Sequence, residues 1–180
     1  MKKLMLVTVL LLGLSSMAVA QDVPAAEVFG GYSFYRCQDT SVDCDLHGWN
    51  AAVDFNFNKN WAITADVSGQ YGWIDNLHPY RWADVKHHNF LFGPRYTISA
   101  GDNVRPYVHA LFGINHVNPK PLFTVENNFA MAFGGGIDVK VNDRVSVRPV
   151  QLDYVGVRRA STIEDNIRYS AGIVFKLGSR

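Results

Sequence analysis

The residues of this chain best suited to chemistry are its six histidines. A histidine that activates a serine must lie within hydrogen-bond reach of the hydroxyl and be oriented by a carboxylate. No histidine is followed two residues later by serine, and His116, for example, precedes Val117 and Asn118. His87 and His88 are adjacent, so they face opposite ways if they lie on a strand. These spacings predict no nucleophilic active site, and we expect a protein that is not an enzyme.

The histidines also lack the spacing of metal ligands. His47, His78 and His87 would meet only if separate loops converged. We therefore predict neither a metal site nor a bound cofactor, and we interpret the histidines as interface or loop residues.

Two cysteines, Cys37 and Cys44, lie close together in a polar stretch. If the chain is exported, it meets an oxidising compartment in which such a pair forms a disulfide. We expect this disulfide to close the base of a small loop, and a pair of free thiols is the alternative.

Charged residues of both signs recur at polar positions of alternating segments. Those sharing this placement are Asp54, Asp66, Arg95, Asp138, Lys140, Arg148, Asp153 and Arg168. Lone buried charges are costly, whereas paired and hydrogen-bonded charges persist inside proteins. We predict a network of ion pairs that fills an interior, and a narrow path for polar solutes or protons is the alternative.

An alternating pattern defines the elements that must position these charges. In the clearest segment, one set of alternate positions is mostly large and apolar, and the other is small or polar. The first set is His47, Trp49, Ala51, Val53, Phe55 and Phe57, and the second is Gly48, Asn50, Ala52, Asp54 and Asn56. Successive strand residues point to opposite faces, so such a segment has one apolar and one polar face. With 13% aromatic residues, 15 glycines and no useful amphipathic helix, the chain is predicted to be all-β.

The pattern recurs along the whole chain and predicts eight strands. Six cover 27–36, 46–57, 61–73, 87–98, 105–117 and 127–141, a seventh follows Asn142 and Asp143, and an eighth ends the chain. Long connections (37–45, 74–86, 118–126 and 158–165) alternate with short ones. This asymmetry is typical of outer-membrane barrels. We predict an all-β, eight-stranded antiparallel up-and-down transmembrane β-barrel, with residues 21–180 forming a single domain.

The seventh segment changes parity at Pro149, because the valines on its two sides belong to different faces. One extra residue, a β-bulge across 148–150, restores the pattern, and a bulge is a place where a sheet tolerates proline. The bulge brings Arg148, Gln151 and Asp153 onto the polar face together.

The apolar face is too bulky to lie inside the barrel. Eight strands enclose just enough room for their own side chains or one small ligand. This volume argues against a soluble lipocalin-like binder, and we expect the apolar face to meet lipid. Aromatic residues near strand ends suit the headgroup regions of a membrane, and we assign Tyr32, Trp49, Trp61 and Trp73 to them.

Residues 1–20 have the parts of a secretory signal peptide, with Lys2, Lys3, an apolar run and a small-residue site at 18–20. The run is shorter than the roughly 20 residues of a membrane helix, which is the alternative. Removing the two lysines from 17 basic residues leaves 15 against 16 acidic ones. This near-neutral balance gives no indication of nucleic-acid binding.

Four segments carry a family resemblance: 27–34, the hairpin 48–72, 89–96 and 168–175. Over nearly the whole mature chain, the sequence resembles the bacterial outer-membrane β-barrel domain family of the OmpA and OmpX type. The resemblance implies a monomeric barrel in the bacterial outer membrane, in contact with its lipid and lipopolysaccharide and inserted by the barrel-assembly machinery. Family chains often end in an aromatic residue that this machinery reads, whereas this sequence ends in Arg180.

The resemblance implies roles that range from envelope structure to adhesion. We hypothesise a non-enzymatic surface protein whose loops meet an extracellular ligand or whose barrel supports the envelope. A narrow small-solute channel is the alternative, motivated by the mixed charges of the polar face. A lipid A-modifying enzyme and a soluble binder are further alternatives, although lipid A deacylases use the His-x-Ser pattern that this sequence lacks.

Overall fold

The computed structural model describes residues 23–38, 44–75, 82–98, 103–120, 126–159 and 161–178, with only the backbone described at 73–75, 82–85 and 118–120. The signal-like residues 1–20 lie outside this part. The described residues form β1 (Ala26–Cys37), β2 (Cys44–Asn56), β3 (Trp61–Asp75), β4 (Trp82–Thr97), β5 (Val104–Lys120), β6 (Glu126–Lys140), β7 (Val145–Arg159) and β8 (Thr162–Leu177). Among them, no helix is long and apolar enough to cross a membrane.

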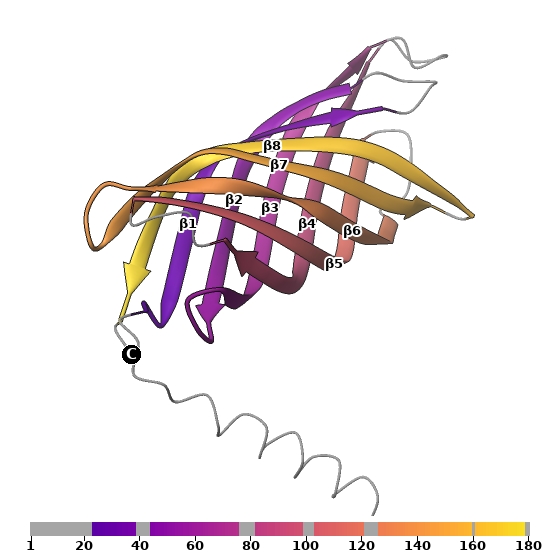
Figure 1. Cartoon of the computed structure of the whole chain (residues 1–180). Coiled ribbons are helices and arrows are strands. Elements are labelled where there is room, and N and C mark those ends of the chain that lie inside the picture. Colours follow the sequence, from indigo (N-terminus) through magenta and orange to yellow (C-terminus); the bar gives the residue numbers. More distant parts are fainter. Residues whose placement is uncertain are drawn as a thin grey trace, which may run out of the picture.

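Each strand pairs with its sequence neighbours, and β8 pairs with β1, so the sheet closes into a barrel (Figure 1). All eight pairings are antiparallel. Closure leaves no free strand edge among the described residues, so the sheet satisfies its own backbone hydrogen-bonding groups, as lipid requires. The predicted eight-stranded antiparallel barrel is confirmed.

Short turns lie at the end of the barrel where β1 begins and β8 ends, which we call the turn end. Asn58 and Asn142 build two of these turns in the same way. The Asn58 Oδ1 accepts hydrogen bonds from the backbone N–H groups two and three residues further on, at 2.9 and 2.8 Å. The Asn142 Oδ1 does the same at 2.9 and 2.8 Å. These side chains hold the chain in the tight reversal that the strands need.

The strands run further toward the opposite end, the loop end, than the alternating pattern predicts. The segment expected to begin at residue 87 begins at Trp82, and β5 continues to Lys120. Most of the connection predicted at 158–165 is strand, because β7 ends at Arg159 and β8 starts at Thr162. The apolar alternation marks the lipid-facing part of a strand, whereas the backbone ladder continues beyond it among polar side chains.

The two faces of the sheet are sorted by polarity. Large apolar side chains lie exposed on the outer surface, with Phe92 at 60%, Phe90 at 52% and Trp61 at 50%. Charged side chains of the opposite parity are buried inside, including Asp54 and Arg95. A soluble barrel has the reverse arrangement, so the soluble lipocalin-like alternative is wrong.

The β-bulge predicted across 148–150 is present. Arg148 pairs with Gly172 of β8 and Gln151 pairs with Ser170, so β7 carries one extra residue between these pairs. The register with β6 shifts at the same place. Arg148, Gln151 and Asp153 are all buried, as the bulge predicts.

Two glycines allow the barrel to close at its last seam. Gly31 of β1 lies opposite Gly172 of β8. A Cβ atom on Gly172 would overlap the backbone of Gly30 and Gly31, and one on Gly31 would overlap Ala171 and Gly172. The two strands approach so closely here that only glycine fits without a backbone shift.

We expect Gly172→Val to destabilise the barrel by about 1–3 kcal/mol or more, the usual cost of overpacking, because neighbouring backbone cannot yield as a side chain can. Urea unfolding in lipid vesicles, followed by tryptophan fluorescence, measures the change. The control is Ala171→Val, which adds two γ-methyl groups but no new Cβ, on the lipid-facing side of the same strand. Equal losses in both variants would show that the seam imposes no special constraint.

Candidate functional site

A first cluster of buried charge fills the interior near the turn end. Arg95 binds Asp54 and donates from Nη2 to Asp138 at 2.5 Å. Arg148 donates from Nε to Asp138 at 2.7 Å, and its Nη2 lies 3.8 Å from Asp54. All four side chains are at most 2% exposed. Each charge therefore has two partners of opposite sign, which compensates for its removal from water.

A second cluster lies further toward the loop end and centres on Arg168. Its guanidinium donates to Asp66 at 2.7 Å and to Asp153 at 2.8 and 3.0 Å. The Nε2 atom of His109 lies 2.7 Å from the Asp153 carboxylate. Asn50 donates to Asp66 at 2.8 Å. The cluster joins strands from all around the barrel, because these side chains come from β2, β3, β5, β7 and β8.

Gln151 and Tyr107 connect the two clusters. Gln151 accepts hydrogen bonds from Arg148 at 2.9 Å and from the Tyr107 hydroxyl at 2.7 Å, and it donates to Asp153 at 2.8 Å. The guanidinium carbons of Arg95 and Arg148 lie 3.7 and 4.5 Å from the centre of the Tyr107 ring. Each of these two guanidinium groups is thus bound by carboxylates at its edge and by the Tyr107 ring at its face.

Seven of the eight charged residues expected inside lie in these clusters, and Lys140 does not. Its ammonium lies 2.7 Å from Asp143 in the next turn, and its side chain is 35% exposed. As the last residue of β6, Lys140 reaches the rim beyond the buried layer. The hydrogen bond and charge of Lys140 hold the pKa of the exposed Asp143 carboxyl below its ordinary value.

Two basic residues that contact buried carboxylates were not among the charged residues predicted to lie inside. His109 contacts Asp153 in the second cluster, and Arg105 donates to Glu27 at 2.6 Å nearer the turn end. Both basic residues lie on the same parity of β5 as Tyr107, which is the polar parity of that strand. Parity alone was the signal that could have found them.

Apolar side chains occupy the interior on both sides of the charges. Phe29 packs with Ala52 and Val174 near the turn end. Tyr35 belongs to a larger cluster reaching the loop end, whose other buried members are Cys44, Leu46, Leu91, Leu111, Val117, Ala130, Ala132, Val155 and Val157. Phe29 and Tyr35 break the alternation of β1 because they point inward, where they cover the charged layer.

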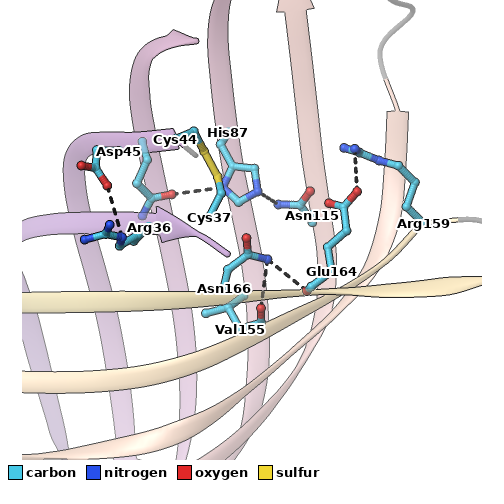
Figure 2. Close-up of a disulfide and its surroundings, with 11 residues drawn as sticks. Arg36, Cys37, Cys44, Asp45, His87, Asn115, Val155, Arg159, Glu164 and Asn166 are labelled. Carbon is cyan, nitrogen blue, oxygen red and sulfur yellow. Dashed lines mark hydrogen bonds and ion pairs between the residues drawn. A yellow bond between two sulfur atoms is a disulfide. The ribbon is translucent and has the colours of Figure 1, made fainter. Parts of the chain in front are cut away.

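A disulfide joins Cys37 at the end of β1 to Cys44 at the start of β2 (Figure 2). The two residues are opposite one another in the strand pairing, with Cα atoms 5.1 Å apart. The predicted disulfide is confirmed. It closes the connection between the strands at the loop end, beside the exposed pair of Arg36 and Asp45.

His87 lies inside the barrel at the loop end (Figure 2). Its ring packs on Tyr35 with ring centres 4.6 Å apart, and its nitrogens lie 2.5 Å from Asn115 and 3.5 Å from Gln70. His47 lies on the outward parity of β2, so it does not meet His87. His78 lies outside the described residues.

The outer surface carries the aromatic residues assigned to membrane interfaces. Tyr32, Trp49 and Trp61 are 48%, 41% and 50% exposed. Trp61 lies at the turn end and packs edge-on against Tyr96, with ring centres 4.9 Å apart. Tyr32 pairs with Trp49 across β1 and β2, closer to the loop end. The side chain of Trp73 lies outside the described part.

The clusters connect strands on different sides of the barrel. In the described part of the chain, no group of three or more His, Cys, Asp or Glu side chains is placed to hold a metal ion. The donors and acceptors of the interior are mostly used by one another, which is the arrangement of a structural core.

An apolar exterior around a closed, charge-filled antiparallel sheet defines a small β-barrel membrane protein. The family model of the outer membrane protein beta-barrel domain matches residues 6–178. The chain belongs to this family, whose location is the bacterial outer membrane. No curated protein sequence matches the chain significantly.

Solved structures support the same fold. Neisserial surface protein A is 12% identical, with a TM-score of 0.70 over 85% of this chain and 97% of that one. OprG from Pseudomonas aeruginosa is 13% identical, with a TM-score of 0.63 over 88% and 98%. Ail of Yersinia pestis, crystallised with the heparin analogue sucrose octasulfate, is 15% identical, with a TM-score of 0.58 over 85% and 99%.

We expect Arg168→Met to destabilise the barrel by about 3–5 kcal/mol, because it removes the arginine that two buried carboxylates share. Unfolding in lipid vesicles measures the loss. Neutralising those carboxylates as well, with Asp66→Asn and Asp153→Asn, should recover much of it.

The matched control is Arg36→Met, which breaks an exposed ion pair with Asp45 and should change stability by about 1 kcal/mol or less. If Arg168→Met were as mild as Arg36→Met, the buried cluster would not be an essential element of the core.

Proposed function

We propose that this protein is a non-enzymatic outer-membrane barrel whose interior is a structural plug and whose activity lies at its extracellular surface or in its support of the envelope. The turn end then faces the periplasm and the loop end faces the exterior, as in outer-membrane barrels generally. The proposal includes a monomer surrounded by outer-membrane lipid and lipopolysaccharide and inserted by the barrel-assembly machinery. The closed sheet supports the monomer, because the described strands have no free edge to pair with another copy.

The filled interior is the observation that carries the proposal. Arg95, Arg148 and Arg168 are each at most 2% exposed and are bound between carboxylates of different strands. A hydrated solute passing along the axis would have to break these contacts and then cross the apolar cluster around Leu111. Both steps are costly, which argues against the alternative of a small-solute channel.

Catalysis has little support among the described residues. His109 and Asp153 form a histidine-carboxylate pair, but their side chains are 3% and 0% exposed, so lipid and solvent do not reach them. His109 contacts no serine, which a hydrolase of the Ser-His type requires. If the protein does not modify lipid A, the acylation of lipid A should be unchanged in a knockout and in an overexpressing strain.

A ligand at the extracellular end fits the same architecture. Loops on a rigid scaffold are the usual carriers of binding function. Ail, a barrel of the same fold, is described in complex with a heparin analogue, which supports ligand binding as a role that this fold can have. The confirmed disulfide and the extended strands beyond the apolar zone support the loop end of this chain as a rigid platform.

We expect the folded protein to give no discrete conductance steps in a planar lipid bilayer, because the charged clusters and the apolar cluster both close its axis. A combined variant in which serine replaces Leu111 and the arginines and aspartates of both charged clusters is the positive control if it still shows heat-modifiable migration. Regular steps from the unmodified protein, absent after a charge-preserving Arg95→Lys change, would favour the channel instead.

We expect bacteria in which 76–81 and 121–125 are replaced by short glycine-containing turns to lose adhesion or outer-membrane integrity while keeping the barrel. Adhesion to abiotic and cell surfaces and uptake of a hydrophobic dye measure these properties. Heat-modifiable migration confirms that the barrel has folded. Replacing the Asn142 turn at the other end by the same sequence is the control. Unchanged adhesion and integrity in the loop variant would refute an extracellular role for these segments.

A further inference from the structure

A row of polar and aromatic side chains crosses the outer surface toward the loop end. Its members lie on the outward parity of adjacent strands and contact one another in pairs: Tyr32 with His47, Tyr71 with His88, and His116 with Asn127. On β4 and β5 the row lies just beyond Phe90 and Ile114, which are 52% and 53% exposed. The row therefore borders the apolar zone on its extracellular side, within reach of water.

Two histidines of the row are direct neighbours. His88 of β4 and His116 of β5 are opposite one another in the strand pairing, and their ring centres are 6.5 Å apart. Directly opposed residues of an antiparallel pair place their side chains on the same face, with Cβ atoms about 4.5–5.5 Å apart. Both rings are only partly buried, so the pair is accessible from outside the barrel.

Each ring uses one nitrogen for a neighbour and leaves the other available. The His116 Nδ1 donates to the Asn127 Oδ1 at 2.8 Å, which leaves the lone pair on Nε2. The His88 Nε2 lies 3.2 Å from the Tyr71 hydroxyl, and in the tautomer with its hydrogen on Nε2 this nitrogen donates to the hydroxyl oxygen and Nδ1 keeps its lone pair. A partner on the second nitrogen is the usual support of a metal-binding imidazole, because it fixes both tautomer and ring orientation.

We propose that His88 and His116 form a binding site on the outer wall of the barrel for a divalent copper, nickel or zinc ion, with water completing the coordination. Metal–nitrogen bonds of about 2.0–2.1 Å bring two ring centres to roughly 5–6 Å, which side-chain rotation can reach from the present separation. Imidazole favours these metals, and Cu²⁺ binds most strongly among them. Lys86, exposed two residues away on the same strand face, lowers the affinity for every divalent cation, so only a metal that imidazole binds strongly is retained.

The site differs in kind from the plug and from the loops. It uses the outward parity of β4 and β5, whereas Arg95 and His109 of the same strands face inward. A protein that binds no metal would leave the proposed function intact. Conversely, a conducting barrel or loop variants without a phenotype would not argue against the metal site.

The test is titration of the detergent-folded protein with Cu²⁺ in a non-coordinating buffer at neutral pH. Calorimetry gives stoichiometry and affinity, and electron paramagnetic resonance reports nitrogen ligands. We expect one Cu²⁺ per chain with two imidazole nitrogens, and His88→Gln or His116→Gln should weaken it by about tenfold or more, since loss of supporting partners alone costs about 10–100-fold. Tyr71→Phe should weaken it less than loss of a ligand.

His47→Gln is the matched control, because His47 lies in the same outward row but its Nδ1 contacts Tyr32 rather than another histidine. It should keep the affinity of the unmodified protein. The metal should also raise the temperature at which the heat-modifiable form is lost, by linking β4 to β5, and this rise should vanish in the double variant His88→Gln with His116→Gln. Equal affinity in the unmodified protein and the double variant, or equal loss in His47→Gln, would overturn the proposal.

Discussion

The structure depends on one constraint: eight closed strands leave an interior that admits side chains but little water, and this interior contains charge. Its three fully buried arginines are each placed between two carboxylates. Each arginine has at least one of these partners on a strand that is not its neighbour, and Arg168 and Asp66 are separated by 102 residues. These longer-range ion pairs therefore form only when the barrel has closed, and they join strands that no backbone hydrogen bond connects. The same contacts connect different walls of the barrel across its interior.

The composition of the inner face follows from the size of a guanidinium group. Where Arg95, Arg148 and Arg168 extend across the interior, small residues such as Ala62, Ala132 and Ser170 occupy other inward positions. Large aromatic side chains are excluded to the outer surface, apart from those that meet an arginine or close an end. Phe29 and Tyr107 lie against guanidinium groups, and the centre of the Phe29 ring is 4.4 Å from the Arg148 Cζ. The two inward rings thus contribute to holding the charges.

The alternation in the sequence predicts which face a residue occupies but not which residues meet. Strand number, the bulge and the inward direction of the charges follow from parity and connection length, because both are local properties. Partner choice depends on how the strands are staggered around the barrel, so the contacts of Arg95 with two different strands could not be predicted. Strand ends were underestimated at the loop end, since polar strand residues carry no apolar pattern. Lys140 shows that strand parity predicts burial only together with the position along the strand, because a residue on the inward face at the rim reaches solvent.

The pairing of His88 with His116 could have been predicted from the sequence of the hairpin. Opposed residues of a hairpin share a face, and the apolar positions of both strands of this hairpin are even-numbered, so a partner of His88 must be even-numbered and lie nearly symmetrically about the turn. The predicted connection 99–104 has its centre between 101 and 102, which is compatible with a partner of His88 at residue 114 or 116. Only the second choice places two imidazoles together, and the strand pairing has that register. The hairpin of β4 and β5 consequently carries two independent sets of side chains. Its inward residues, Arg95, Tyr107 and His109, contact the buried carboxylates and Gln151. Its outward residues, His88 and His116, touch none of the buried carboxylates. A β-barrel wall can therefore gain or lose an external binding site without altering the core that keeps it closed.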